Sequence, residues 1–223
     1  RKSQIVIAMK EVLIRALTGA VLVAVVVFSL LFSVYSAFAL CAILSILGLI
    51  ELRRNKMGGV FSALFVVIAF MSLFMIGFYP FLDLKPNNYT GLPPLYFMIA
   101  VWVNDTFAYL GGRLLGRKII SRGLAPEISP NKSWEGAVVG MLGSFYIGFC
   151  MIDIIIGFFF ALIAALATCG DLVQSAAKRR VGIKDTGTIF PGHGGVIDRF
   201  DSLLIAAPVL IIIMLSCTNY VFQ

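Results

Sequence analysis

Side chains that could carry chemistry gather in residues 170–201, a polar stretch of an otherwise apolar chain. The first part of this stretch contains Asp171, Ser175, Lys178 and Arg179. These residues recur every three or four positions, so a helix that continues through them would place them on one face. Such a face would combine a carboxylate, a hydroxyl and cations, which are groups that bind phosphate or a metal ion.

The second part of the stretch is rich in glycine and contains the only histidine of the chain. Gly194 and Gly195 follow His193, and glycine allows the backbone to turn sharply and bring its N–H groups close to a phosphate. Asp198 and Asp201 come next, three residues apart, and would lie on one side of a helix. A lone histidine is more often a structural hydrogen-bond partner than a catalytic base, so a functional role for His193 depends on these neighbours.

A second polar segment, residues 104–136, places a carboxylate inside an apolar run. Asp105 lies well within residues 95–115, which are otherwise mostly apolar. A charged side chain at that depth costs about 2.5 to 3.5 kcal/mol on insertion scales, so it must face the protein interior and not lipid. We expect a functional role for Asp105, and the alternative is a structural ion pair with an arginine or lysine of a neighbouring helix.

Together the two segments supply carboxylates from helix ends, lysines, arginines and a glycine-rich loop. Proteins use these groups to handle phosphates with a divalent metal, because Mg²⁺ prefers oxygen ligands and is held by one or two carboxylates plus substrate phosphates. The alternative for each charge alone is a solvated residue beside the membrane. This alternative is strongest for residues 178–180, since such basic clusters also bind anionic lipid headgroups nonspecifically.

The composition requires lipid as the solvent for most of the chain. Of the 223 residues, 60% are hydrophobic and 13% are charged, whereas a soluble domain carries about 25% charged residues. The net charge is +7, but the basic residues form short clusters between apolar runs, which excludes the long basic stripe of a nucleic-acid surface. The four cysteines lie in or beside apolar segments without a CxxC pair, so we interpret them as packing residues and not as zinc ligands or disulfides.

Apolar runs of membrane-spanning length predict an all-α, polytopic integral membrane protein. A bilayer core needs about 20 apolar residues per helix, and the chain offers about seven such spans, in a range of roughly six to nine. They are a two-helix hairpin within residues 16–52 that turns near Ser33 to Ser36, and single helices at 59–79, 95–115, 134–151, 154–170 and 200–221. We treat residues 1–223 as one membrane domain, with 1–100 as the scaffold and lipid side and 101–223 as the catalytic helices and loops.

The distribution of lysine and arginine predicts the orientation in the membrane. Basic residues of short loops stay on the cytoplasmic side. With seven spans and a cytoplasmic N-terminus, all but one of the 18 basic residues lie on that side, and Lys85 is the exception. We therefore expect the site at the cytoplasmic face of a membrane, such as a bacterial inner membrane. Lys178 and Arg179 should lie at a solvent-exposed helix end.

Both polar segments resemble the signature of the phosphatidate cytidylyltransferases, also called CDP-diacylglycerol synthases. Ser-x-x-Lys-Arg falls on Ser175, Lys178 and Arg179, Lys-Asp-x-Gly falls on Lys184, Asp185 and Gly187, and Pro-x-His-Gly-Gly-x-x-Asp-Arg-x-Asp falls on residues 191–201. The upstream segment is similar to the family at Asp105, Ala108, Tyr109, Gly116, Arg117, Ser129, Pro130, Lys132, Ser133, Glu135 and Gly136. Ala177 departs from the pattern, since the family usually has a bulkier apolar residue there. The resemblance covers residues 104–201.

The resemblance implies transfer of the cytidylyl group of CTP to phosphatidic acid, which gives CDP-diacylglycerol and pyrophosphate in phospholipid biosynthesis. It implies that Asp171 and Asp198 bind Mg²⁺, with a second cation left open. The implied catalytic residues are Asp171, Asp198, Lys184, His193 and Asp201. The implied substrate-binding residues are Ser175, Lys178, Arg179, Arg199, Asp105, Lys132, Ser133, Gly194 and Gly195. The implied partners are CTP, phosphatidic acid, membrane lipids and a second copy of the chain.

Three other functions fit parts of the pattern. A CTP-dependent lipid kinase or a cytidylyltransferase acting on an ether-linked lipid would use the same phosphate-binding groups on a different acceptor. An ion-coupled transporter would use Asp105 and the polar segments as an ion path. The halves of the sequence show no inverted repeat, and transport does not require a glycine-histidine loop beside paired aspartates, so transport is the weakest of the three.

Overall fold

The chain folds into helices. The structure is a computed structural model that describes residues 2–79, 85–192 and 194–221, with side chains described between residues 12 and 216. Its helices are α1 (Lys2–Phe32), α2 (Val34–Arg54), α3 (Val60–Ile76), the 3-10 turn η1 (Pro86–Asn88), α4 (Leu92–Leu115), α5 (Trp134–Met151), α6 (Ile154–Arg180), α7 (Val196–Arg199) and α8 (Asp201–Val221). Within these ranges the only β structure is two isolated bridges. The all-α prediction is confirmed.

The predicted hairpin is present at its predicted turn. α1 ends at Phe32 and α2 begins at Val34. Ser33 caps α2, because its hydroxyl accepts a hydrogen bond from the N–H of Ser36 at 3.1 Å, and Ser36 Oγ donates back to the carbonyl of Ser29 at 2.8 Å. These bonds satisfy backbone groups that a helix end leaves without partners, which matters most where water is scarce.

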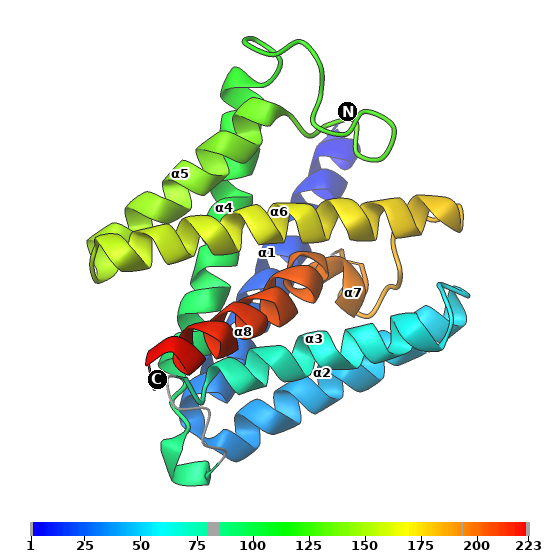
Figure 1. The fold of residues 1–223 in the computed structure, drawn as a ribbon. Helices are drawn as coiled ribbons and strands as arrows, with labels where there is room; N and C mark the ends of the chain where they lie inside the picture. The colour runs from blue at the N-terminus through cyan, green and yellow to red at the C-terminus, as the bar shows by residue number, and fades with distance from the viewer. Residues whose placement is uncertain (1, 80–84, 193, 222–223) are drawn as a thin grey trace.

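The helices form a curved row in which each contacts its neighbours. The order is α2, α3, α8, α6, α5 and α4, and α1 closes the row by packing on α2 and α4. Figure 1 shows α2, α3, α6 and α8 running side by side, with α1 and α4 crossing them. The second half of the chain, from α4 to α8, therefore forms a continuous group that brings both polar segments together.

Small residues allow α4 and α5 to pack closely. An added Cβ at Gly136 would lie 2.8 Å from the carbonyl of Ala108, and one at Gly143 would lie 2.5 Å from the ring of Phe107. The glycine face of α5 is thus occupied by α4 of the same chain.

The core joins buried side chains of α1, α2, α3, α4, α6, α7 and α8, and the exterior is apolar. Phe70 and Phe200 meet edge to face with ring centroids 5.6 Å apart, and both are buried. Around the outside, Phe61 is 88% exposed and Phe158 is 65% exposed. Within the described residues, four helices are long and apolar enough to cross a membrane, and 60–76 and 201–216 form shorter apolar helices. This exterior is that of an integral membrane protein; the count of seven spans stays a prediction.

The polar loops lie together at one end of the helices, and the tight turns lie at the other. Arg15 on α1 approaches the glycine-rich loop, because an added Cβ at Gly192 would come within 2.7 Å of its Cγ. Near the opposite end of α1, Tyr89 Oη donates to the carbonyl of Leu30 at 3.1 Å. In Figure 1 the C-terminal ends of α2 and α6 lie beside α7. The loops therefore lie at two ends of the helices, and the side of the membrane that each end faces stays a prediction.

Candidate active site

Helix α6 carries the predicted polar face. The helix begins at its cap Asp153, whose carboxylate accepts from the N–H of Ile156 at 2.9 Å, and it continues to Arg180. Ser175 Oγ donates to Asp171 Oδ1 at 3.2 Å, which confirms that residues one turn apart share a face. Asp171 also forms an ion pair with Lys132, which lies 39 positions earlier in the loop before α5. The two polar segments of the sequence therefore meet at Asp171.

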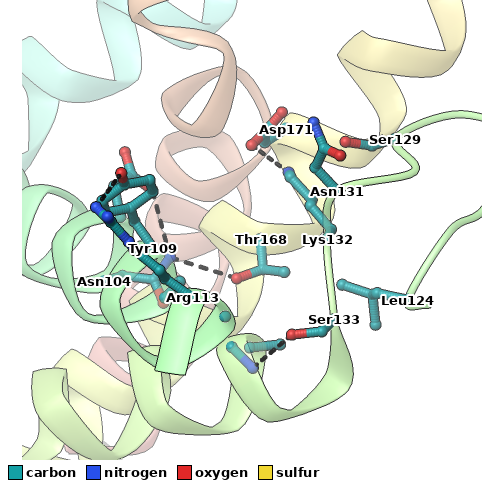
Figure 2. A pocket seen from close by; sticks show the side chains of 15 residues that line it. Asn104, Tyr109, Arg113, Leu124, Ser129, Asn131, Lys132, Ser133, Thr168 and Asp171 are labelled. Atoms are coloured by element: carbon teal, nitrogen blue, oxygen red, sulfur yellow. Dashed lines mark hydrogen bonds and ion pairs between the residues drawn. The ribbon is translucent and has the colours of Figure 1, made fainter. Parts of the chain in front are cut away.

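A cavity of about 530 Å³ opens beside this ion pair. α4 contributes Asp105 and Arg113, the loop before α5 contributes Lys132, and α6 contributes Thr168 and Asp171. In Figure 2, Lys132 points toward Asp171, and Arg113 lies beside Tyr109 at the other side of the cavity. The cavity has the size typical of small-molecule sites. It places cations from two elements around a space that could hold a phosphorylated ligand.

Hydrogen bonds to the first turn of α5 hold the loop of residues 116–133, which carries Lys132. Ser133 caps α5 by accepting from the N–H of Gly136 at 3.1 Å. Glu135 is buried in the first turn of α5 and accepts from the N–H groups of Ile119 at 3.0 Å and Ile120 at 2.7 Å. The resemblance implies that Ser133 binds substrate; it lines the cavity, but its hydroxyl also serves the helix cap.

Asp105 lines the cavity, and its avoidance of lipid stays a prediction. Its carboxylate interacts electrostatically with Asp171 and Lys132, so it belongs to the same charge cluster. The preceding residue, Asn104, donates from Nδ2 to Thr168 Oγ1 at 3.3 Å and thereby joins α4 to α6. Asn104 Oδ1 is buried without a hydrogen-bond partner among the described residues. Sequence reasoning did not single out Asn104 or Thr168, although both line the cavity.

A second charged cluster lies behind α6. Lys178 Nζ is 2.9 Å from Asp198 Oδ1 and 3.9 Å from Asp201 Oδ2. Asp198 Oδ2 accepts from the backbone N–H of Thr186 at 2.7 Å and of Gly195 at 2.9 Å. Burial alone would raise the pKa of the Asp198 carboxyl, but these hydrogen bonds and the Lys178 ammonium hold that pKa below its usual range. The pairing therefore stabilises the fold above the ordinary pKa of an aspartate and is lost as the pH falls through the lowered value.

Glu51 is a residue of this cluster that the sequence did not reveal. It lies at the end of α2, is 2% exposed, and accepts from Thr186 Oγ1 at 2.8 Å and from the N–H groups of Val196 at 2.7 Å and Ile197 at 3.0 Å. Gly195 allows this approach, because an added Cβ there would lie 2.5 Å from both carboxylate oxygens. Glu51 thus fixes the start of α7, and with it Asp198.

Lys178 corrects one expectation from the sequence. We expected it at a solvent-exposed helix end, but the residue is 8% exposed, because α7 and its preceding loop cover that face of α6. Arg179, one position further, is exposed as expected and donates to the carbonyl of Ile183 at 2.9 Å. The helical periodicity gave the correct face but could not show that another element packs on it.

Replacing these two neighbours should therefore give different results. Lys178→Ala leaves Asp198 and Asp201 without their cation, and breaking a buried ion pair from one side costs about 3 to 5 kcal/mol of unfolding free energy. Arg179→Ala should change the unfolding free energy by less than about 1 kcal/mol, as at exposed sites generally. Thermal unfolding of both variants in the same detergent measures the difference. Equal melting temperatures would contradict the buried pair.

The remaining predicted residues lie in the segment from residue 184 to residue 201, which contributes to the second cluster. Lys184 and Arg199 are exposed, Gly194 has a φ of +87° that favours glycine, and Gly195 is buried. His193 lies outside the described residues, so its role stays a prediction. Asp201 begins α8 and interacts electrostatically with Asp171 and Asp105. Asp105, Asp171 and Asp201 therefore lie close enough to interact electrostatically. Asp198 belongs to the second cluster, where it pairs with Lys178.

The carboxylates suit a metal ion only when a bound phosphorylated molecule completes its coordination. Among the described residues, no three His, Cys, Asp or Glu side chains lie close enough to hold a metal ion by themselves. Asp198 and Asp201 already share one cation, the Lys178 ammonium, and Asp171 holds the Lys132 ammonium. Mg²⁺ fits such a donor set, because it is commonly bound by one or two carboxylates and completed by phosphate oxygens and water. Convergence of Asp171 and Asp198 on one ion stays a prediction.

Comparisons with known proteins assign the chain to a family. The sequence profile of the cytidylyltransferase family matches residues 12–217. The chain is 38% identical over 174 residues to a phosphatidate cytidylyltransferase of Staphylococcus saprophyticus, covering 74% of this chain and 64% of that protein. It is 43% identical over 147 residues to the Rickettsia bellii enzyme of the same name, covering 60% and 61%, and 41% identical over 126 residues to that of Haemophilus influenzae, covering 51% and 42%. The matched regions thus span between 42% and 64% of the length of these relatives. The chain belongs to the cytidylyltransferase family.

Proposed function

We propose that this protein transfers the cytidylyl group of CTP to phosphatidic acid and releases pyrophosphate. The observation that carries the proposal is the cavity at Asp171, where Lys132 and Arg113 face a space beside carboxylates at the polar end of membrane helices. Relatives at 38% to 43% identity carry the name of this activity. A site for a lipid and a nucleotide must lie where a bilayer meets water, and this cavity has that position in the predicted topology.

The reaction requires positioning and charge neutralisation more than covalent help from the protein. An oxygen of the phosphatidate phosphate forms a bond to the α-phosphorus of CTP, and the bond from that phosphorus to the oxygen bridging to the β-phosphate breaks, so that pyrophosphate leaves with the electron pair. Negative charge grows on the phosphate oxygens, and cations fixed in advance around them lower the barrier.

Several residues of the chain have defined tasks in this proposal. Lys132 and Arg113 bind phosphate oxygens in the cavity, and Asp171 holds Lys132 in place until a ligand arrives. Asp171 and Asp198 would hold Mg²⁺ together with substrate oxygens, with Asp201 in support, and the metal would supply further neutralisation of the developing charge. Ser175 orients Asp171 through its hydrogen bond. Arg179, Lys184 and Arg199 are exposed cations that can attract the anionic substrates.

The proposal includes a location and a division of labour along the chain. The site lies at the cytoplasmic face, as the basic residues predict, and residues 101–223 contain the catalytic helices. Residues 1–100 form the scaffold, but Glu51 shows that the scaffold also reaches the second charged cluster. A homodimer in a bacterial inner membrane stays part of the proposal, implied by the resemblance.

Labelled CTP tests the proposed reaction. The purified protein is incubated with phosphatidic acid, Mg²⁺ and CTP labelled at either the α- or the γ-phosphate, and the lipid products are separated. We expect the α-label to enter lipid and the γ-label to leave as pyrophosphate. Lipid carrying only the γ-label would show a kinase, and activity confined to an ether-linked acceptor would change the substrate. Binding of CTP without any labelled product would contradict the proposed reaction.

A further inference from the structure

The exposed segment between α4 and the cavity loop combines apolar and basic side chains on a rigid backbone. Ile119 is 77% exposed and Ile120 is 44% exposed. Lys118 and Arg122 flank them and are exposed as well. Two bulky apolar side chains held out of the protein beside cations are unfavourable in water but suit the boundary between lipid headgroups and acyl chains, where each type finds its preferred surroundings.

The segment is held in this arrangement by the buried Glu135. Its two oxygens accept from the N–H groups of Arg117 at 3.2 Å, Ile119 at 3.0 Å and Ile120 at 2.7 Å. The Arg117 side chain donates to the carbonyl of Pro130 and braces the segment from the other side. With the backbone N–H groups bonded inward, the isoleucine side chains remain outside. The exposure of Ile119 and Ile120 is therefore a property of the folded loop and not of a loose chain.

The apolar surface of this segment continues that of a membrane helix. Leu110 and Leu114 lie one turn apart on α4 and are 45% and 64% exposed. α4 ends at Leu115, so Ile119 follows within about one turn's length of the helix end. The exposed apolar surface of α4, which is predicted to contact lipid, thus continues from Leu114 to Ile119 in the loop. Arg113 on the same helix lines the cavity.

We propose that Ile119 and Ile120 insert into the lipid interface while Lys118 and Arg122 bind the phosphates of anionic lipids, so that the segment sets the cavity mouth at headgroup level. Anionic lipid is the partner that matches both the apolar and the cationic side chains, because a juxtamembrane cation gains energy only from negative headgroups. The proposal does not rest on the proposed reaction, since lipid contact requires neither CTP nor turnover.

Depth-dependent quenching tests the proposal. Ile119→Cys is prepared in a protein whose four native cysteines are replaced, labelled with an environment-sensitive fluorophore, and reconstituted without CTP into vesicles of phosphatidylcholine with phosphatidylglycerol. Interfacial insertion lies about 5 to 10 Å below the surface. We therefore expect a blue-shifted emission and loss of fluorescence with lipids brominated near the top of the acyl chain. Emission like that of the free dye in water, without quenching, would overturn the proposal.

A matched label on the same loop is the control. Glu127 is exposed and charged, so a label at Glu127→Cys should emit as in water and escape quenching. Equal quenching at both positions would mean that the whole loop is immersed and would contradict insertion by two isoleucines. A blue shift at residue 119 that depends on protein concentration in detergent and is insensitive to brominated lipid would show that a second protomer covers the surface, which also overturns the proposal.

The role of charge has its own measurement. Brominated phosphatidylglycerol and brominated phosphatidylcholine are compared at the same mole fraction. We expect the label at residue 119 to be quenched more by the anionic lipid in the parent protein and equally by both lipids after Lys118→Gln and Arg122→Gln, because each cation favours an anionic neighbour by about fivefold. Equal quenching by the two lipids in the parent would overturn the assignment of anionic lipid.

Discussion

Replacing Asp171 by asparagine is expected to lower the rate of CDP-diacylglycerol formation by about 100-fold or more, as for the loss of one charge-stabilising group in an active site. Asparagine keeps the shape of the side chain but removes the negative charge that Lys132 and Mg²⁺ require. The fold should survive, because Asp171 is 28% exposed and Lys132 is 27% exposed, and such a pair contributes less than about 1 kcal/mol. Excess Mg²⁺ should restore little activity.

Asp153 provides the control for this variant. It lies at the other end of the same helix and caps α6 by accepting from the N–H of Ile156. Asparagine caps helices as well as aspartate does, so Asp153→Asn should keep both stability and activity. The measurement is metal-dependent product formation by purified proteins of matched thermal stability. A near-normal rate for Asp171→Asn would refute its role, and an inactive Asp153→Asn would place the site at the wrong end of α6.

Replacing Glu51 should have the largest effect on stability. Glu51→Ala leaves the N–H groups of Val196 and Ile197 and the hydroxyl of Thr186 without their acceptor, and each buried group left so costs about 1 to 3 kcal/mol. The loss of unfolding free energy should be on the order of 3 to 6 kcal/mol. Glu51→Gln should lose less, about 1.5 to 3 kcal/mol, because its amide oxygen still accepts while its NH₂ group faces a backbone donor.

A double-mutant cycle separates this bond network from general damage. Thr186→Val removes one donor to Glu51, so its cost should be smaller in the Glu51→Gln background than in the parent protein. Glu127→Gln, at an exposed position, should leave the melting temperature unchanged. Additive costs for Glu51→Gln and Thr186→Val would show that the two side chains do not stabilise each other. Glu51 would then not fix the start of α7 through this network.

The sequence predicted most of the helices because the signal for them is local. Apolar runs of spanning length gave the hairpin at Ser33 and helix α5 at its observed bounds. The three-to-four-residue spacing on α6 gave the shared face of Asp171 and Ser175, which their hydrogen bond confirms. The position of Asp105 in an apolar run predicted that it avoids lipid. Each of these inferences needs only neighbouring residues or the length of one helix.

The remainder of the site depends on contacts between distant segments. Glu51 bonds to Val196 across 145 positions, and no local pattern records that approach. One signal could have drawn attention to it: Glu51 is among only three acidic residues in the first hundred, and it sits at the end of an apolar run. The burial of Lys178 was missed for the same reason, since α7 covers it from another part of the chain.

The position of Asp171 along α6 has a consequence for the surrounding bilayer. From Ile154 to Gly170 the helix is uncharged, and this stretch is about 25 Å long at 1.5 Å per residue. The hydrocarbon core of a typical bilayer is about 30 Å thick. If Ile154 lies at one boundary of that core, Asp171 lies about 5 Å short of the other. A phospholipid whose phosphate is to meet Asp171 must therefore sink by about that distance, and local thinning of the bilayer costs only fractions of a kcal/mol per Å.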